Sequence, residues 1–330
     1  MTMRKILYFT APKQVEVREE RLPVLGDDEA LVETLYSAIS AGTEMLVYRG
    51  QFSQMTDEQD EISSALQYPL TYGYSCVGRV VETGKTVDKS WKGKNVFSFQ
   101  PHSSFFIAQA SSLLPLPHEI LPEAACFLPN METAVNLVQD GAPILGERVL
   151  VLGQGVVGLL TAALLSEFPL SALSTHDLYP LRQKALGLPV EKLDGGGNAQ
   201  SGYANELFDL VFELSGAPAA LDDAIALTKF SGRIVIGSWY GQKRAPLDLG
   251  GRFHRSRIKL IASQVSSIAP ELSARWSKTR RFEVAWRALA RIKPERWITR
   301  RFPLADAAKA YQLLDERPEE TIQVIFEHKS

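Results

Sequence analysis

The sequence predicts an α/β protein in which a small antiparallel β domain precedes a parallel sheet covered by helices. Up to about Val96, short runs such as QVEVREE, GRVVE and KNVFSF are bounded by Gly, Pro, Asp or Asn, which is typical of strands in an antiparallel barrel or sandwich. From Arg148 onward, apolar strands alternate with helical patterns, which favours a parallel sheet covered on both faces. A chain of 330 residues also exceeds one ordinary core, so two domains are expected.

Three further segments complete the expected order of elements. LPEAACFLPNMETAVNLVQD has helical spacing, and Pro122 stands where a helix would begin. The acidic stretch Ser53–Gln67 is expected to form a solvated loop or a short helix. From Arg296 the pattern predicts a strand, a helix that starts near Leu304 and a closing strand that could return to the first domain.

The composition excludes several classes of partner. A formal net charge of −2 gives no overall basic field, so neither nucleic acid nor an anionic membrane is expected. The two cysteines, Cys76 and Cys126, are not spaced for a metal site and are too few for a disulfide framework, which favours the cytoplasm. The start, MTMRKILYFTAPK, does not resemble a signal peptide. The most hydrophobic run, Val149–Leu165, has 17 residues, fewer than the roughly 20 of a membrane helix.

A glycine-rich turn follows the apolar strand RVLVL and opens an apolar helix. Its residues have the spacing GxGxxG and are Gly153, Gln154, Gly155, Val156, Val157 and Gly158. In this context the glycines permit a tight turn, a close approach of a pyrophosphate and close packing of helix on strand, and the helix N-terminus can bind phosphates. The turn therefore predicts dinucleotide binding by a Rossmann fold. A packing turn without a ligand is the alternative.

The type of dinucleotide depends on the end of the second predicted strand. Asp177 lies 19 positions after Gly158, where a carboxylate could accept hydrogen bonds from the adenosine ribose and repel a 2′-phosphate. NAD(H) is therefore favoured over NADP(H), although Arg182 nearby keeps NADP(H) open.

Several phrases together resemble those of the medium-chain dehydrogenase/reductase family, which includes the zinc-type alcohol dehydrogenases. They are ISAGTEMLVYRG, YPLTYGYSCVGRVVETG, RVLVLGQGVVGLL, DLVFELSG and GRIVIGSWYG. The resemblance covers nearly the whole chain and implies a GroES-like β-barrel catalytic domain beside a Rossmann domain with a doubly wound parallel sheet. It implies a catalytic domain over residues 1–124, a dinucleotide-binding domain over residues 125–289 and a return to the catalytic domain over residues 290–330.

The resemblance also implies that the chain binds no catalytic zinc. The zinc alcohol dehydrogenases hold the metal at three motif positions, which match Ala41, Tyr74 and Pro129 here, and Ser75 replaces the glutamate of their G-H-E motif. None of the three matched residues is a useful zinc ligand. The four-cysteine structural zinc lobe of the family is also missing from the sequence.

Two branches of the family lack zinc, and the motif residues of this chain match them to different degrees. The quinone and enone reductases carry an asparagine and a tyrosine where this chain has Ala41 and Leu46, which argues against a quinone substrate. ISAGTE followed by G-Y is similar to the branch that includes the dehydrogenase of a bacteriochlorophyllide hydroxyethyl side chain. That similarity implies alcohol-to-ketone chemistry without identifying the substrate.

Without zinc, hydroxyl groups must exchange a proton with the substrate oxygen and stabilise its developing charge. The resemblance puts Thr43 where the zinc enzymes keep a proton-relay hydroxyl, and Tyr74 where a metal ligand faced the reacting centre. These two are the first catalytic candidates, with Ser40, Glu44 and Ser75 as neighbours. Tyr74 could instead fill the volume of the missing metal, and Thr43 and Glu44 could make local turn hydrogen bonds.

On the cofactor side, the remaining candidates follow the ends of predicted strands, beyond which ligands of such sheets bind, or lie in the helix that the family has beneath the nicotinamide. They are Thr133, Ser215, Gly216, Ser238, Trp239 and Tyr240. Trp239 could instead belong to ordinary packing between domains.

A basic cluster suits recognition of an anionic substrate, because arginine binds carboxylate and phosphate groups in a forked geometry. Its members are Arg252, His254, Arg255, Arg257, Lys259, Arg275, Lys278, Arg280 and Arg281. A solvated helix face and salt bridges between chains are the alternative.

The sequence therefore predicts a zinc-independent, NAD(P)-dependent oxidoreductase that transfers a hydride between nicotinamide and an alcohol/carbonyl substrate. An enone or quinone reductase of the same fold is one alternative, and a dinucleotide-binding sensor or structural protein without turnover is another. The strands GRIVIGSWYG and RIKLIAS could pair two sheets, so a homodimer is expected.

Overall fold

The computed structural model describes residues 3–52, 67–187, 191–192 and 207–328, and the chain forms two compact units. The first unit comprises Met1–Pro129 and Lys293–Ser330, and the second comprises Asn130–Ile292. The catalytic and dinucleotide-binding roles assigned to residues 1–124, 125–289 and 290–330 stay predictions. The acidic stretch predicted to be a loop or short helix lies outside the described residues, apart from Gln67.

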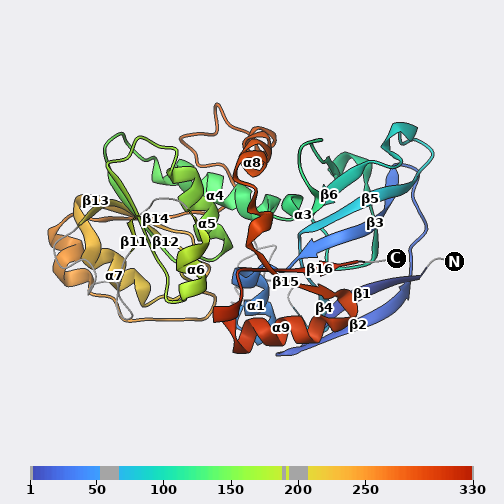
Figure 1. Cartoon of the computed structure of the whole chain (residues 1–330), viewed down its shortest axis with the longest axis horizontal. Coiled ribbons are helices and arrows are strands. Elements are labelled where there is room, and N and C mark those ends of the chain that lie inside the picture. Colours follow the sequence, from blue (N-terminus) through green and yellow to red (C-terminus); the bar gives the residue numbers. More distant parts are fainter. Residues whose placement is uncertain (1–2, 53–66, 188–190, 193–206, 329–330) are drawn as a thin grey trace. The chain divides into compact units, whose positions relative to one another are not determined.

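The second unit contains a six-stranded parallel sheet (Figure 1). Its strands are β9 (Arg148–Leu152), β10 (Ala172–His176), β11 (Glu191–Lys192), β12 (Phe208–Glu213), β13 (Thr228–Ile236) and β14 (Lys259–Ala262). Its helices are α4 (Leu128–Gly141, which begins at the boundary), α5 (Val156–Leu165), α6 (Pro180–Ala185), α7 (Ala220–Leu227) and α8 (Lys278–Ile292). The spatial order β11-β10-β9-β12-β13-β14 reverses direction between β9 and β12. The predicted α/β class with a doubly wound sheet is confirmed.

Strand β9 shows why these sequences form a parallel sheet. The four residues Val149–Leu152 are at most 2% exposed, and such an unbroken apolar run is expected of a strand covered on both faces. Leu150 and Leu152 belong to one core cluster with apolar residues of α7, and α5 contacts β9 and β10. The glycine-rich turn therefore follows a central strand at the point where the sheet order reverses, which is where ligands of such sheets bind.

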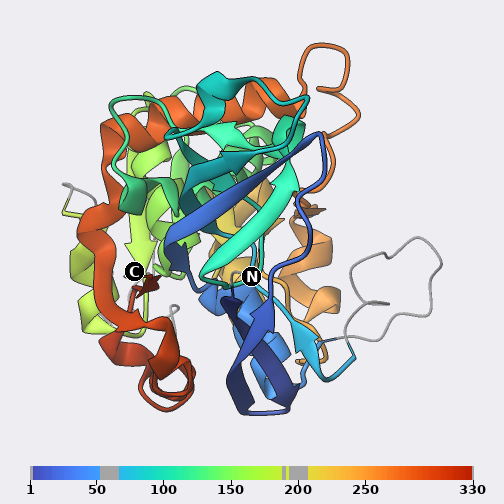
Figure 2. The ribbon, with the colours of Figure 1, turned by 90° about the vertical axis from the view of Figure 1, so that its right-hand side faces the viewer.

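The first unit contains a seven-stranded and a three-stranded sheet, viewed in Figure 2 with the β1–β2 hairpin in dark blue. The three-stranded sheet has β2 (Gln14–Arg21), β1 (Met3–Ala11) and β4 (Leu70–Thr71). The larger sheet has β15 (Ile298–Pro303), β16 (Gln323–Glu327), β3 (Glu29–Ala38), β5 (Cys76–Thr83), β6 (Asn95–Ser98) and β8 (Leu114–Pro115), with β7 (Phe105–Gln109) paired to β3. The pairs are antiparallel except for β15 with β16.

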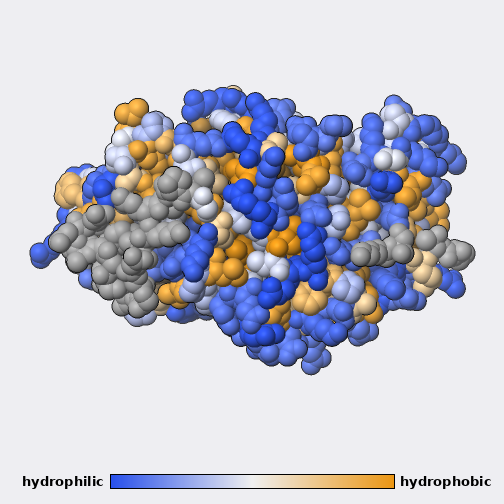
Figure 3. All heavy atoms as spheres, in the orientation of Figure 1, coloured by the Kyte–Doolittle hydropathy of each residue, from blue (hydrophilic) through white to orange (hydrophobic). Residues whose placement is uncertain are grey.

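The C-terminal segment joins the first unit, as the closing strand suggested. Strand β16 pairs with β3, and helix α9 (Ala307–Glu316) buries one face in the same core. That face has Ala307, Ala310, Tyr311 and Leu314 at helical spacing, whereas the exposed side carries polar residues, in keeping with the hydrophilic lower edge in Figure 3. The helix starts three residues later than predicted, because Leu304–Asp306 form a 3₁₀ turn.

Two helical segments differ from the elements expected from the sequence. The helical stretch that begins at Pro122 is two helices, α3 (Pro122–Ala125) and α4, and α1 (Ala41–Arg49) follows β3 directly. Among the residues that the structure describes, no helix is both long and apolar enough to cross a membrane.

Arg281 on α8 is fully buried, which removes it from the predicted anion-binding cluster. Its guanidinium donates to Glu132 Oε1 at 2.8 and 3.0 Å, to Asn136 Oδ1 at 2.5 Å and to the carbonyls of Val265 and Ser267. These five contacts match the five N–H donors of an arginine. Arg281 therefore joins α8, α4 and the segment after β14 instead of facing a ligand.

Replacing Arg281 with methionine should destabilise the second unit by about 3–5 kcal/mol, because Glu132 would remain buried without its main charged partner. The exposed Arg287→Met on the same helix should change stability by less than about 0.5 kcal/mol. Urea unfolding followed by circular dichroism measures both. Equal stability of the two variants would show that the buried ion pair is not needed.

Candidate active site

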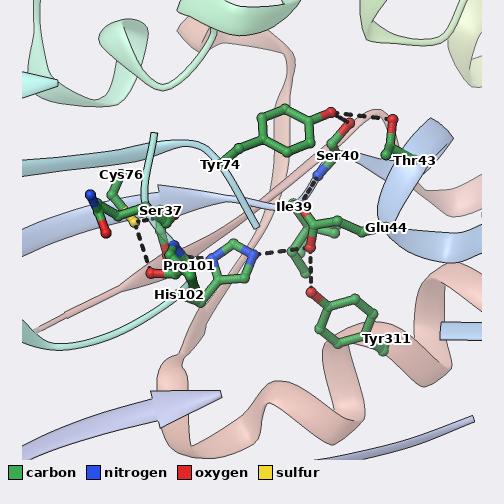
Figure 4. Close-up of polar contacts among 12 residues, drawn as sticks. Ser37, Ile39, Ser40, Thr43, Glu44, Tyr74, Cys76, Pro101, His102 and Tyr311 are labelled. Atoms are coloured by element: carbon green, nitrogen blue, oxygen red, sulfur yellow. Dashed lines mark hydrogen bonds and ion pairs between the residues drawn. The ribbon is translucent and has the colours of Figure 1, made fainter. Parts of the chain in front are cut away.

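Three hydroxyl groups of the first unit form a hydroxyl cluster, which we define as Ser40, Thr43 and Tyr74 (Figure 4). The Tyr74 hydroxyl donates a short hydrogen bond to Ser40 Oγ and lies 3.3 Å from Thr43 Oγ1. All three side chains are half-buried. Tyr74 has one hydroxyl proton, so it donates to one neighbour and can accept from the other. Sequence reasoning named these three residues, and the structure brings them together.

The start of α1 explains why Ser40 is available to Tyr74. Ser40 is the N-cap residue, yet its side chain makes no cap hydrogen bond. Glu44 Oε1 accepts the Ser40 N–H at 2.8 Å and so fixes the backbone of this residue, while the Ser40 hydroxyl accepts from Tyr74. Glu44 thus does make a local turn hydrogen bond, the alternative left open above.

Below the hydroxyl cluster lies a carboxylate cluster, which we define as Glu44 with its donors His102 and Tyr311. Glu44 Oε2 is 3.0 Å from His102 Nε2 and 2.5 Å from the Tyr311 hydroxyl (Figure 4). All three residues are fully buried. Sequence analysis named Glu44 as a candidate but neither His102 nor Tyr311. Gly73 packs against His102, since an added Cβ at this glycine would lie 2.8 Å from the imidazole.

The carboxylate cluster continues to a second histidine through Ser37. Ser37 Oγ lies 2.8 Å from His102 Nδ1 and 2.9 Å from His328 Nε2, so its one proton serves one ring and its lone pairs the other. Burial, with a smaller effect of His102, lowers the pKa of His328 to about 3. His328 is therefore neutral at physiological pH.

The environment keeps the Tyr74 hydroxyl protonated. Burial raises the pKa of Tyr74 above its usual value, the nearby Glu44 carboxylate acts in the same direction, and the hydrogen bonds with Ser40 and Thr43 oppose them. A protonated phenol can donate a hydrogen bond or a proton to a bound oxygen, whereas it is not a base at neutral pH.

Ser75 and Cys76 face away from this chemistry. The Ser75 hydroxyl donates to the Cys126 carbonyl at 2.6 Å, so this candidate is not joined to the hydroxyl cluster. The Cys76 thiol is buried and donates to the carbonyls of Gln100 and Pro101, just before His102. Burial raises its pKa, which is consistent with a packing residue and not with a reactive thiol.

In the second unit, the glycine-rich turn has the geometry that its spacing predicts. Gly153 has φ +90°, and an added Cβ would lie 2.6 Å from the Leu214 backbone. A Cβ on Gly158 would lie 1.9 Å from the Gly153 carbonyl oxygen, so α5 packs tightly on β9. Gly155, in contrast, has no atom within 4 Å of an added Cβ, so it borders open space at the N-terminus of α5. Val156 and Val157 follow it and are half-buried.

Asp177 lies against the same turn. Its carboxylate accepts the backbone N–H groups of Gln154 at 2.7 Å and Tyr179 at 2.8 Å, while the Gln154 side chain turns inward to carbonyls of the strand end. A carboxylate has about four acceptor positions, so further hydrogen bonds remain possible. Arg182 packs its guanidinium 4.8 Å from the centre of the Tyr179 ring.

The ends of β12 and β13 meet at Glu213, which sequence reasoning missed. This buried carboxylate accepts from the N–H and the hydroxyl of Ser215 and, at 2.5 Å, from the Tyr240 hydroxyl. Ser238 Oγ accepts the Gly216 N–H at 2.9 Å. Four candidates thus form one ordered edge, while Trp239 is 39% exposed and Thr133 lies half-buried on α4. A charged residue at the end of the apolar run DLVFELSG was the available signal.

Comparison with known proteins identifies this architecture. Residues 26–112 match the alcohol dehydrogenase GroES-like domain. The chain is 22% identical to L-galactonate-5-dehydrogenase of Escherichia coli K12, over 94% of this chain and 95% of the relative. These matches confirm the predicted likeness to the zinc-type alcohol dehydrogenases of the medium-chain dehydrogenase/reductase family.

Solved structures of dehydrogenases align with nearly the whole chain. The 2R,3R-butanediol dehydrogenase of Bacillus subtilis aligns with a TM-score of 0.79 and 17% identity, over 98% of this chain and 99% of that one. An alcohol dehydrogenase of Escherichia coli CFT073 complexed with NADH aligns with a TM-score of 0.78 and 18% identity, over 99% of this chain and 100% of that one. At this identity the likeness establishes the shared fold.

The medium-chain family contains zinc enzymes, and a zinc site in a protein is built from Cys, His and carboxylate side chains. The positions that match zinc ligands hold Ala41, Pro129 and Tyr74, whose hydroxyl is bonded to Ser40. Within the described ranges, no group of three or more His, Cys, Asp or Glu side chains could hold a metal ion. These residues do not fit a catalytic zinc.

The other basic residues of the predicted anion-binding cluster contact different parts of the second unit. Arg252 donates to the Thr228 carbonyl, and Arg280 lies 4.3 Å from the centre of the Trp276 ring. Together with the burial of Arg281, these contacts weaken the hypothesis of one anion-binding cluster. Arg255, Arg257 and Lys259 are exposed.

Replacing His328 with glutamine should flatten the loss of stability in acid. The folded-state pKa lies below the ordinary value of about 6.5, so below that pH the unfolded chain binds a proton that the folded chain excludes. The wild type should therefore lose up to about 1.4 kcal/mol per pH unit more than His328→Gln as the pH falls from about 6.5 toward 3. The exposed His118→Gln should follow the wild type. Parallel slopes for all three proteins in urea unfolding would contradict a buried neutral His328.

Proposed function

We propose that this chain is a zinc-independent, NAD(P)-dependent oxidoreductase that transfers a hydride between nicotinamide and an alcohol/carbonyl substrate. The hydroxyl cluster carries the proposal, because it presents protonated and acceptor oxygens at the position where relatives in the family would hold a metal. Dehydrogenase relatives that act, by name, on a galactonate and a butanediol support a secondary alcohol as the reacting group.

The residues present fit a dinucleotide. The open space beside Gly155 admits a pyrophosphate close to the backbone, and the first N–H groups of α5 point toward it. Asp177 would accept hydrogen bonds from the adenosine ribose, and Ser215, Gly216, Ser238 and Tyr240 would form the edge near the nicotinamide ribose. When bound, the nicotinamide supplies or accepts the hydride.

The proton chemistry is assigned to the hydroxyl cluster. In the direction of reduction, the Tyr74 hydroxyl would donate to the carbonyl oxygen and pass its proton to it as the hydride reaches the carbon. Ser40 and Thr43 would stabilise the tyrosine oxygen while it carries negative charge, since both are within reach of it. No step requires a metal ion.

A wild-type assay tests the proposal directly. Protein dialysed against a chelator and checked for metal content would be mixed with NADH or NADPH and a panel of ketones, hydroxy acids and enones. We expect cofactor oxidation with carbonyl substrates that chelation does not abolish. Activity only with enones or quinones would favour a reductase of C=C bonds, and cofactor binding without turnover would favour a sensor.

Replacing Tyr74 with phenylalanine should lower kcat for carbonyl reduction by about 10²- to 10⁴-fold, because the proton donor is lost while the ring remains. NADH binding should be unchanged. Tyr8→Phe, which removes a phenol bonded to Glu20 on the β1–β2 hairpin, should keep the wild-type rate. A fully active Tyr74→Phe would mean that Tyr74 only fills space.

Replacing Asp177 with serine should weaken NADH binding by about tenfold, the equivalent of one or two hydrogen bonds. NADPH should lose less affinity or gain it, because a charge that repels the 2′-phosphate has gone. Calorimetric titration of both cofactors measures the ratio, with the exposed Glu283→Gln as control. An unchanged ratio would remove Asp177 from cofactor selection.

A further inference from the structure

We infer that His102 and Tyr311 are positioning residues for the reaction: they hold the Glu44 carboxylate, which holds Ser40 in the orientation that receives the Tyr74 hydroxyl. This inference rests on the proposed function and deepens it. In the described part of the chain, neither residue is hydrogen-bonded to the hydroxyl cluster, and both act through Glu44.

The first step is the fixation of Glu44. Its side chain is fully buried and accepts from three donors: the Ser40 N–H, His102 Nε2 and the Tyr311 hydroxyl. A buried carboxylate is stable only when it is paired and hydrogen-bonded. If one donor is lost, the carboxylate is expected to shift toward water or toward another donor, and its bond to Ser40 shifts with it.

The second step is a competition for Ser40. An N-cap serine normally turns its hydroxyl to the N–H groups of the first helical turn. Here Glu44 accepts the backbone N–H of Ser40 and so fixes the N-cap residue, while the serine hydroxyl bonds to Tyr74 and not to the first helical turn. Without a fixed Glu44, the Ser40 hydroxyl can return to capping α1, and Tyr74 then loses its closest partner.

The third step is the fixation of His102 itself. Ser37 holds Nδ1 at 2.8 Å, the Phe326 ring lies edge-on at 5.0 Å between centroids, and Gly73 leaves room for the imidazole that any Cβ would remove. Gly73 directly precedes Tyr74, so the same imidazole that orients Glu44 also packs against the backbone that carries the tyrosine.

Two substitutions at position 102 distinguish the contact made by Nε2 of His102 from the contact made by Nδ1. In His102→Gln the amide can replace Nε2 and keep the contact with Glu44, whereas in His102→Asn it can replace only Nδ1 and keep the contact with Ser37. We expect His102→Asn to lower kcat for carbonyl reduction by about 10- to 100-fold, as for a misplaced catalytic group, and His102→Gln to restore most of the rate. Tyr311→Phe, which removes a single hydroxyl, should act in the same direction as His102→Asn and serves if that variant folds poorly. The NADH dissociation constant should stay within about twofold, since binding is assigned to the second unit.

A double-mutant cycle distinguishes positioning from a merely structural role. If His102 acts through Tyr74, His102→Asn should cost little further rate in a Tyr74→Phe background. If the losses of kcat in the two single variants multiply in the double variant, the inference is overturned. An unchanged kcat in folded His102→Asn would overturn it as well. Thr34→Val, a buried substitution on the same β3 strand as Ser37, is the matched control and should keep the wild-type rate.

A spectroscopic measurement keeps the inference testable without turnover. In protein labelled with ¹³Cζ-tyrosine, the Tyr74 signal, assigned with Tyr74→Phe, should move in His102→Asn and stay in place in Thr34→Val. A signal that does not move would overturn the positioning role. If the Tyr74 signal moves in His102→Asn but the wild-type protein reduces no carbonyl, the contact network is upheld and only the proposed function is refuted.

Discussion

The buried carboxylate of Glu44 is the interaction on which the site of the first unit depends. It draws together three segments that are distant in sequence, since His102 is 58 positions and Tyr311 is 267 positions away. The return of the C-terminal segment is therefore more than a closing strand: β16 pairs with β3, and α9 delivers Tyr311 into the core. A desolvated charge without these donors would cost several kcal/mol, so the chain can bury Glu44 only when all three segments are in place.

The polar groups of the site in the first unit form two layers that differ in burial and charge. The hydroxyl cluster is half-buried and uncharged, which suits contact with a substrate oxygen. The carboxylate cluster beneath it is fully buried and makes a dense set of hydrogen bonds. The aromatic rings of Phe9, Tyr48 and Phe326 surround Tyr311, at 5.2, 5.3 and 6.4 Å between centroids, and keep water away from this lower layer.

Local patterns sufficed for the parts of the structure that short segments determine. The β9 strand, the Gly153 turn and α5 follow from adjacent residues, and the motif match located Ser40, Thr43 and Tyr74. His102 and Tyr311 escaped because a lone polar residue carries no local sign of a partner far along the chain, whereas Glu213 was marked by its place at the end of an apolar strand. Arg281 was open to prediction: the buried residues of α8 are Arg281, Ala285, Ala288, Leu289 and Ile292, so the arginine stands in register with the apolar face.

The electrostatics of the site favour one protonation state of Tyr74 near neutral pH. Burial and the Glu44 carboxylate both raise the pKa of Tyr74, so the phenol is a proton donor over the physiological range. Donation to a carbonyl oxygen needs this protonated form, whereas removal of a proton from an alcohol needs the phenolate. A metal would reverse this preference, because a nearby cation stabilises the ionised oxygen. In the proposed reaction Tyr74 would therefore act as the acid when a carbonyl group is reduced, and it would have to be ionised to act as the base in the reverse direction.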